Sequence, residues 1–197
     1  MRDKWYSDNR DLIKWSILLL LAHRSNADRV IQIAFLNASE FGDIEIDGER
    51  HQIPQEVLSH FRDIGNITAL SRHPRISVFD CSLHDRNSYV RAALDFIASF
   101  SQELCVVFLD PDTGLEPNGG GDAKHVLNTE ARAFWDALPK GWQFVFYQHE
   151  TNKAGKPWIE EKRAQLASAI GVSVNDVGVA LDQKIAKDVV FFHVSKA

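Results

Sequence analysis

Polar residues that could do chemistry follow a long apolar segment in the middle of the chain. Asp110, Pro111 and Asp112 open a polar, glycine-rich stretch that runs to residue 127. Connections between a strand and a helix are usually two to six residues long, and longer ones often bind ligands. A carboxylate at this point can accept a hydrogen bond or hold a proton. We expect Asp110 and its two neighbours to act in a site, although such residues also form simple turns.

A second polar group, Tyr147, Gln148 and His149, ends a later apolar segment. Histidine changes charge near neutral pH, so His149 could act as an acid, a base or a metal ligand beside Asp110. Tyr147 could belong to the core or could stack on a planar substrate. Tyr147 and Gln148 are therefore candidate substrate contacts.

Three further residues are candidates by position. Lys14 interrupts the apolar face of the first predicted helix, so its ammonium group reaches either solvent or a site. Asp80 follows the second predicted strand, where an acidic residue can accept a hydrogen bond from a ribose hydroxyl or cap a turn. Asn37 follows the first predicted strand, and we expect Asn37 and Asp80 to contact a cofactor.

The charge pattern limits the partners of the chain. The 197 residues carry a formal net charge of −5, which excludes a general binder of duplex nucleic acid. Basic residues nevertheless gather between 153 and 163, directly after His149. This segment, including Lys153, predicts a local contact with nucleic-acid phosphates or with substrate, or else a solvated surface.

Hydrophobic periodicity predicts alternating helices and strands. Helices are expected at residues 9–24, 54–64, 89–100, 129–138 and 159–170, and strands at 29–36, 75–80, 104–110, 143–148, 176–181 and 188–194. Segment 104–110 is almost entirely apolar, which is typical of a strand buried on both faces of a parallel sheet. The last two strands are too close for a crossover helix and should pair antiparallel.

This order predicts a single domain over residues 1–197 with a doubly wound α/β fold. The sheet should be mostly parallel, with about six or seven strands and a C-terminal antiparallel hairpin. Residues 40–52 should form a short exposed acidic hairpin or excursion, and residues 111–127 a glycine-rich loop. Ligands of such sheets bind beyond the carboxyl ends of the strands.

Other features place the chain among cytoplasmic proteins. Its longest apolar run, within residues 13–22, is about half of the roughly 20 residues that span a membrane, and the first residues do not form a secretory signal. Cys81 and Cys105 are expected to be buried free thiols. A Gly-x-Gly-x-x-Gly turn and a Walker phosphate loop are both lacking, which excludes standard dinucleotide and P-loop enzymes.

Two segments resemble known methyltransferases. Asp8-Asn-Arg-Asp-Leu-Ile-Lys14-Trp resembles the N-terminal Asn-x-x-Asp-x-x-Lys segment of bacterial ribosomal-RNA adenine methyltransferases, and Phe108-Leu-Asp-Pro-Asp112 resembles their Asp-Pro-Pro-Tyr motif. Phe108-Leu-Asp-Pro-Asp-Thr-Gly-Leu-Glu116 and Tyr147-Gln-His149 are closer to an uncharacterised bacterial family with a methyltransferase-like fold. The terminal hairpin is also typical of S-adenosylmethionine-dependent methyltransferases.

The resemblance implies S-adenosylmethionine as cofactor and a nucleic-acid substrate. Asp110 and the Pro111 carbonyl would accept hydrogen bonds from a target amino group. Thr113 stands where the family has the aromatic that stacks on the base, which leaves Tyr147 as its substitute.

Two other hypotheses stay open. Asp110, Asp112 and His149 could hold magnesium or manganese in a metal-dependent nuclease or phosphohydrolase. Alternatively, an apolar plug built by Phe35, Leu36 and Phe41 could fill the cofactor position, which would leave a non-catalytic interaction module.

Overall fold

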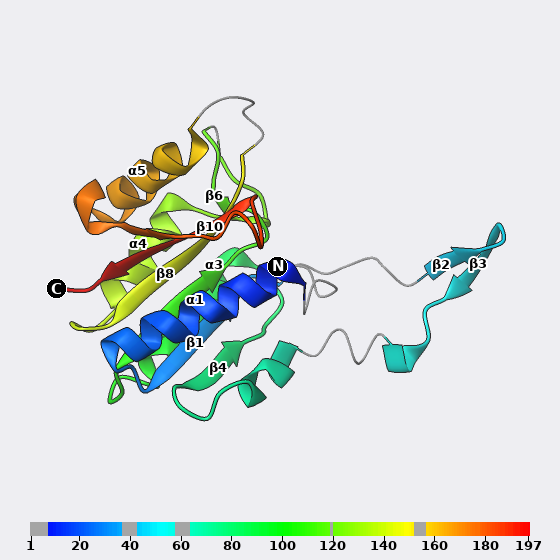
Figure 1. The fold of residues 1–197 in the computed structure, drawn as a ribbon, viewed down its shortest axis with the longest axis horizontal. Helices are drawn as coiled ribbons and strands as arrows, with labels where there is room; N and C mark the ends of the chain where they lie inside the picture. The colour runs from blue at the N-terminus through cyan, green and yellow to red at the C-terminus, as the bar shows by residue number, and fades with distance from the viewer. Residues whose placement is uncertain (1–7, 37–42, 58–63, 119, 152–156) are drawn as a thin grey trace.

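A computed structural model describes residues 8–36, 43–57, 64–118, 120–151 and 157–197. Its centre is a six-stranded sheet in the order β4-β1-β5-β8-β10-β9 (Figure 1). The strands are β1 (Arg29–Ala34), β4 (Arg75–Phe79), β5 (Cys105–Asp110), β8 (Gln143–His149), β9 (Gly178–Ala180) and β10 (Val189–Ser195). The first four in this spatial order are parallel, and β10 pairs antiparallel with both β8 and β9. The expected mostly parallel α/β sheet with a terminal antiparallel hairpin is confirmed.

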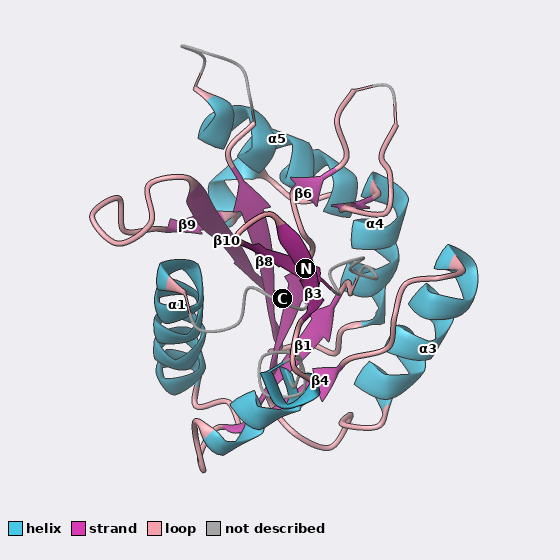
Figure 2. Ribbon diagram, turned by 90° about the vertical axis from the view of Figure 1, so that its right-hand side faces the viewer, coloured by secondary structure: helices cyan, strands magenta, loops and turns pink. Residues whose placement is uncertain are grey.

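Helices cover both faces of this sheet (Figure 2). Helix α1 (Asn9–Ser25) and the 3-10 helix η1 (Ile64–Ala69) contribute to one hydrophobic core, which we call the α1 face. The other core packs against the opposite face. Its helices are α3 (Arg86–Ala98), α4 (Asn128–Ala137) and α5 (Trp158–Ile170), and a 3-10 turn, η2 (Val174–Asp176), follows them. Strand β5 is buried along its whole length because both layers cover it, as its apolar sequence predicts.

The strand order reverses between β1 and β5. From β1 the chain crosses to β4 on one side, then returns past β1 to β5 on the other. In open α/β sheets such a reversal leaves a crevice outside the carboxyl ends of the two strands, where ligands bind. Ala34 ends β1 and Asp110 ends β5, and these two residues are register partners. The fold therefore places Asp110 at the position where a ligand is expected.

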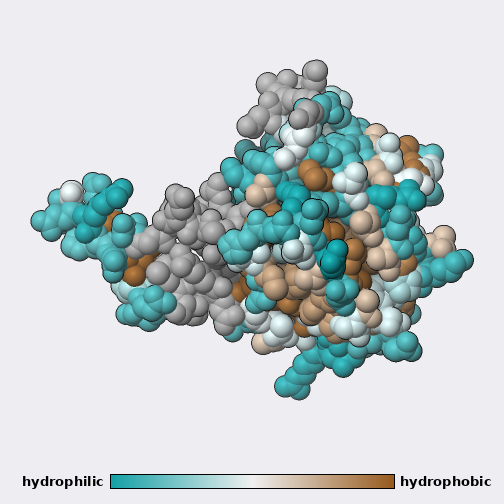
Figure 3. All heavy atoms as spheres, turned by 180° about the vertical axis from the view of Figure 1, so that it is seen from behind, coloured by the Kyte–Doolittle hydropathy of each residue, from teal (hydrophilic) through white to brown (hydrophobic). Residues whose placement is uncertain are grey.

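The acidic excursion forms a separate two-stranded hairpin. Strands β2 (Asp43–Ile46) and β3 (Glu49–Gln52) pair with each other, and all eight residues are exposed. Asp47 and Gly48 both have positive φ, as the tight turn of a two-residue hairpin requires. The hairpin is drawn apart from the sheet in Figure 1, and its surface in Figure 3 is mainly hydrophilic. This confirms the expected hairpin for residues 43–52, while residues 40–42 lie outside the described part.

Several expectations differ from the structure. The glycine-rich loop contains two short parallel strands, β6 (Gly114–Leu115) and β7 (His125–Val126). The helix predicted at 54–64 is helical at 55–57, its residues 58–63 are not described, and η1 begins at 64. Both cysteines are free, but Cys81 is exposed, because it follows the end of edge strand β4; only Cys105 is buried as expected. None of the described helices combines the length and hydrophobicity that crossing a bilayer requires.

Candidate functional site

Helix α1 begins at the carboxyl edge of the sheet because Asp8 caps it. The Asp8 carboxylate accepts hydrogen bonds from the backbone nitrogens of Arg10 (2.8 Å) and Asp11 (3.0 Å), which would otherwise lack partners in the first turn. Asn26, in the left-handed conformation, ends the helix. This start brings the side chain of Lys14 over the ends of β1 and β5.

Lys14 lies at the centre of a buried polar group that we call the Asp110 cluster, formed by Asp11, Lys14, Gln32 and Asp110. Lys14 Nζ is 2.8 Å from Asp11 Oδ1 and 2.9 Å from Asp110 Oδ2. Gln32 Nε2 donates to the same Asp110 oxygen at 2.7 Å. Every member has a relative exposure of 6% or less. The ammonium group of Lys14 therefore points into the site and not into solvent.

The electrostatics of the cluster keep Lys14 charged. Burial alone lowers the pKa of the Lys14 ammonium group, but the charges of Asp110 and Asp11, with their hydrogen bonds, hold this pKa above its ordinary value. Both described donors to the Asp110 side chain bind Oδ2, and none of the described residues donates to Oδ1. Asp110 therefore offers an oriented carboxylate oxygen to a further donor.

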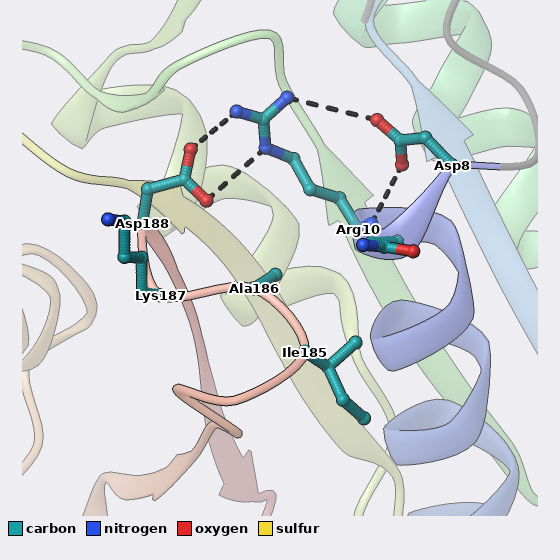
Figure 4. Close-up of a pocket in the computed structure, with 7 residues that line it drawn as sticks. Asp8, Arg10, Ile185, Ala186, Lys187 and Asp188 are labelled. Carbon is teal, nitrogen blue, oxygen red and sulfur yellow. Dashed lines mark hydrogen bonds and ion pairs between the residues drawn. The ribbon is translucent and has the colours of Figure 1, made fainter.

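A second group, the Asp188 cluster, consists of Arg10, His149 and Asp188. Arg10 binds the Asp188 carboxylate through Nε and Nη2 (Figure 4). His149 Nε2 lies 3.1 Å from Asp188 Oδ2. Antiparallel pairing places these groups together, because Val189 of β10 is the register partner of His149. His149 thus contacts Asp188, and no direct contact with Asp110 joins it to the first cluster.

The Asp188 cluster borders an open pocket of about 550 Å³. Arg10 and Asp188 both line it, and Figure 4 shows their side chains facing each other. The hydrogen bond from Arg10 holds the pKa of the Asp188 carboxyl below its ordinary value, and the same bond raises the pKa of Arg10. Both groups are charged at neutral pH, so the positive charge of Arg10 at the rim of the pocket is neutralised by Asp188.

Tyr147 is buried on the α1 face between the two clusters. Its ring meets the ring of Phe191 at 71° with 5.6 Å between centroids, and its relative exposure is 6%. A ring packed in this way has no open face on which a base could stack. Burial and, next, the charge of Asp110 raise the pKa of its hydroxyl, so Tyr147 stays neutral over the physiological range.

Gln148 points to the opposite face and fixes the loop after β5. Its Oε1 accepts from Leu115 N at 2.9 Å, and its Nε2 donates to the carbonyls of Thr113 (3.3 Å) and His149 (2.7 Å). Gly114 has φ +132°, and a Cβ there would lie 2.4 Å from the Gln148 amide. Gln148, which the sequence suggested as a substrate contact, is fully buried and instead holds the loop in place.

Two basic residues of the predicted patch at 153–163, Lys162 and Arg163, lie in the part of the chain that the structure describes, and both bind groups of the fold. Lys162 is 4% exposed because its Nζ donates to the carbonyls of Leu115 (3.2 Å) and Glu116 (3.1 Å). Arg163 Nε donates to Val177 O at 2.7 Å. Both cations hold the fold together, and Lys153 lies outside the described residues. The sequence suggested a patch because spacing alone does not show that α5 turns Lys162 inward.

The remaining candidates occupy different positions. Asp80 is exposed at the carboxyl end of β4, Pro111 is buried, and Asp112 is half-buried. Asn37 lies outside the described residues. No group of three His, Cys, Asp or Glu side chains within the described ranges could hold a metal ion. With Lys14 on Asp110 and Asp188 on His149, the proposed magnesium or manganese ligands do not converge there.

Sequence reasoning missed four members of the two clusters. Asp11 precedes Lys14 by three residues, which on a helix places both on one face. Gln32 is a polar residue flanked by apolar residues within the first strand, so both signals could have been used. Arg10 and Asp188 are 178 residues apart, and no local pattern joins them.

Comparisons with protein-family models, with curated proteins and with solved structures found no match to this chain.

Proposed function

We propose that the chain is an S-adenosylmethionine-dependent methyltransferase that modifies an amino group of a nucleic acid. The observation that carries the proposal is the position of Asp110. It ends β5 at the strand-order reversal, Lys14 and Gln32 fix one of its carboxylate oxygens, and the other has no donor among the described residues.

This arrangement suits the activation of an amino group. A carboxylate that accepts a hydrogen bond from an amino group raises the electron density on the nitrogen and stabilises the positive charge that develops there. Asp110 is held in place, so it needs no reorientation during the reaction. S-adenosylmethionine would supply the electrophilic methyl group.

The carboxyl edge also offers residues for the cofactor. The exposed carboxylate of Asp80 directly follows β4, the neighbour of β1, and can accept from the hydroxyls of a ribose. Asp80 and Asp110 thus lie at the carboxyl ends of the strands on either side of β1. The terminal strand β10, inserted antiparallel between β8 and β9, agrees with the implied methyltransferase-like fold.

Phe35 favours a second candidate, a non-catalytic interaction module. Directly after β1, Phe35 is fully buried, with ring centroids 5.1 Å from Tyr89 and 6.2 Å from Phe134. Aromatic side chains therefore fill the α3 and α4 side of the β1 end. Leu36 is half-buried, and Phe41 lies outside the described residues.

Titration of the protein with S-adenosylmethionine in a calorimeter separates the two candidates. We expect saturable binding, and transfer of label from methyl-tritiated cofactor to total bacterial RNA or to genomic DNA. Asp110→Asn should keep cofactor binding and lose about 100-fold in transfer. Asp95→Asn, an exposed carboxylate on α3, is the matched control. An absence of binding at millimolar cofactor would overturn the proposal in favour of the module.

A further inference from the structure

The outer side of α1 is apolar although it faces away from the sheet. Leu18 and Leu21 pack into the core, but Leu12 and Leu20 have relative exposures of 58% and 62%. In Figures 1 and 2, α1 lies at the outside of the molecule, and no described helix or strand lies over its outer side. A helix that is hydrophobic on all sides is normally buried on all sides. The outer side of α1 is therefore suited to contact another molecule.

A groove of about 390 Å³ runs between this helix and η1. Its apolar lining consists of Leu12, Trp15, Leu19, Ile67 and Leu70. Leu70 is half exposed there. The polar groups nearby already have partners, because Asp11 is paired with Lys14 and the Ser16 hydroxyl donates to a backbone carbonyl of α1 at 2.8 Å. An apolar side chain can therefore enter the groove without separating Asp11 or Ser16 from its partner.

The spacing of residues along α1 indicates what binds there. Leu12, Ser16 and Leu20 are four residues apart, so they form one ridge on the outer side, which we call the Leu12–Leu20 ridge. Ridges of this kind pack one helix against another. The order leucine, serine, leucine is the same from either end. A second α1 that runs in the opposite direction therefore places its Leu20 opposite Leu12, and the two Ser16 residues opposite each other.

The charges at the ends of α1 favour the same antiparallel arrangement. Asp8 lies four residues before the ridge, and Arg24 lies four residues beyond it. Asp8 caps the helix through Oδ1, and its Oδ2 is 3.8 Å from Arg10. Arg24 is exposed and forms no ion pair within the part of the chain that the structure describes. Antiparallel packing brings the acidic end of one helix to the basic end of the other and also opposes the two helix dipoles.

We infer that the Leu12–Leu20 ridge binds a second copy of this chain, in a two-fold dimer with antiparallel α1 helices. Leu20 of each copy enters the groove of the other copy, where it contacts Leu12 and Leu70. A two-fold interface uses the same patch on both copies, so the patch must complement itself. The ridge meets this requirement, because each copy supplies one protruding leucine and one groove.

Sedimentation equilibrium of the full chain, from about 1 to 500 µM, tests the inference. One helix pair with two grooves lies at the small end of specific interfaces, so we expect a dimer with a Kd of about 10 µM. Leu20→Glu should weaken dimerisation at least about 100-fold, because the change enters the interface twice and brings a charge into an apolar groove. Arg24→Gln should weaken it only about threefold, as expected for an exposed charge at the rim.

Paired substitutions test the antiparallel register. Leu12→Lys combined with Leu20→Glu places opposite charges face to face and should restore a dimer that weakens as NaCl is added. Leu12→Glu combined with Leu20→Glu should stay monomeric, and this double variant should pair with a Leu12→Lys, Leu20→Lys copy when the two are mixed. A restored dimer in the first variant, and a mixed dimer in the second case, both require that a second copy occupies the groove.

Two controls separate a lost contact from a lost fold or a different contact. Leu20 is exposed in the single chain, so Leu20→Glu should keep the wild-type Tm at concentrations where the wild type is monomeric. Ile44→Glu changes an exposed residue of the β2–β3 hairpin and should dimerise like the wild type.

Four results would overturn the inference. The first is a wild type that stays monomeric over the whole range, which is the result expected if a segment of the same chain fills the groove. The second is a dimer that persists in Leu20→Glu. The third is loss of the dimer in Ile44→Glu, which would assign the contact to the hairpin. The fourth is failure of the opposite-charge variants to restore pairing.

Discussion

Two buried lysines lie on opposite faces of the sheet and hold the two ends of one motif. Lys14 on the α1 face pairs with the carboxylates of Asp110 and Asp11, whereas Lys162 on the other face donates to the backbone carbonyls of Leu115 and Glu116. Each lysine has a relative exposure of 4%. Burial is thus equal, but one contact is between charges and the other is between a charge and dipoles.

The different contacts of the two lysines divide the segment between residues 110 and 116 into two parts. Its first residue faces α1 and presents a carboxylate at the edge of the sheet. Its later residues are fixed by Gln148, Lys162 and the start of α4, where Glu116 Oε1 accepts from Asn128 N at 2.7 Å. Chemistry is expected on the α1 face, and the opposite face holds the loop rigid.

The comparison is tested most severely by removing the two ammonium groups. Lys14→Met leaves two buried carboxylates without their cation and should lower the free energy of unfolding by about 3 to 5 kcal/mol. Lys162→Met leaves carbonyl groups short of a donor and should cost about 1 to 3 kcal/mol. Urea denaturation at pH 7 measures both values. Equal losses would show that the two faces do not differ in this way.

The rigidity of the opposite face can be tested at Gly114. Gly114→Ala forces a left-handed backbone on alanine and drives its Cβ into the Gln148 amide, so we expect a loss of about 2 to 3 kcal/mol. Gly120 also has a positive φ, but a Cβ there meets nothing within 4 Å. Gly120→Ala is therefore the control and should cost about 1 kcal/mol. Calorimetric Tm values rank the two variants, and a reversed ranking would show that the Gln148 amide does not fix the loop at Gly114.

The smallest effect is expected at the rim of the α1 face. The bond from Arg10 depresses the pKa of Asp188 in the folded protein, so its stabilisation is present above the ordinary value of 3.8 and lost as the pH falls through the folded value. Asp188 is partly exposed, which limits the contribution to about 0.2 to 1 kcal/mol. Urea midpoints of the wild type and Asp188→Asn should differ at pH 7 and converge near pH 2. A constant difference would exclude this linkage.

The sequence predicted the sheet well because short apolar runs in the local sequence indicate which strands are buried. The apolar run that ends at Asp110 and the close spacing of the last two strands each limit the structure to one arrangement, and both predictions are confirmed. The sequence marked Lys14 as an interruption of an apolar helix face, and the structure shows that its ammonium group contacts Asp110. Side-chain direction was harder to predict: a one-residue step along β8 turns Tyr147 to one face and Gln148 to the other.

Contacts between distant segments could not be predicted either, because local sequence patterns do not show which segments pair. His149 was expected beside Asp110, because both end parallel strands. Its partner instead comes from the residue that precedes β10, whose antiparallel entry between β8 and β9 brings Asp188 to the same edge. Local sequence cannot show which late strand will occupy that place.

The insertion of β10 between two earlier strands has a consequence for synthesis of the protein on the ribosome. Until residues 189–195 have left the exit tunnel, the edge of β8 has no neighbour and Arg10 lacks Asp188. The rim of the pocket therefore assembles after the residues of the Asp110 cluster have all been made. We expect nascent chains that already contain Lys14 and Asp110 to lack the contact between Arg10 and Asp188 until β10 is in place.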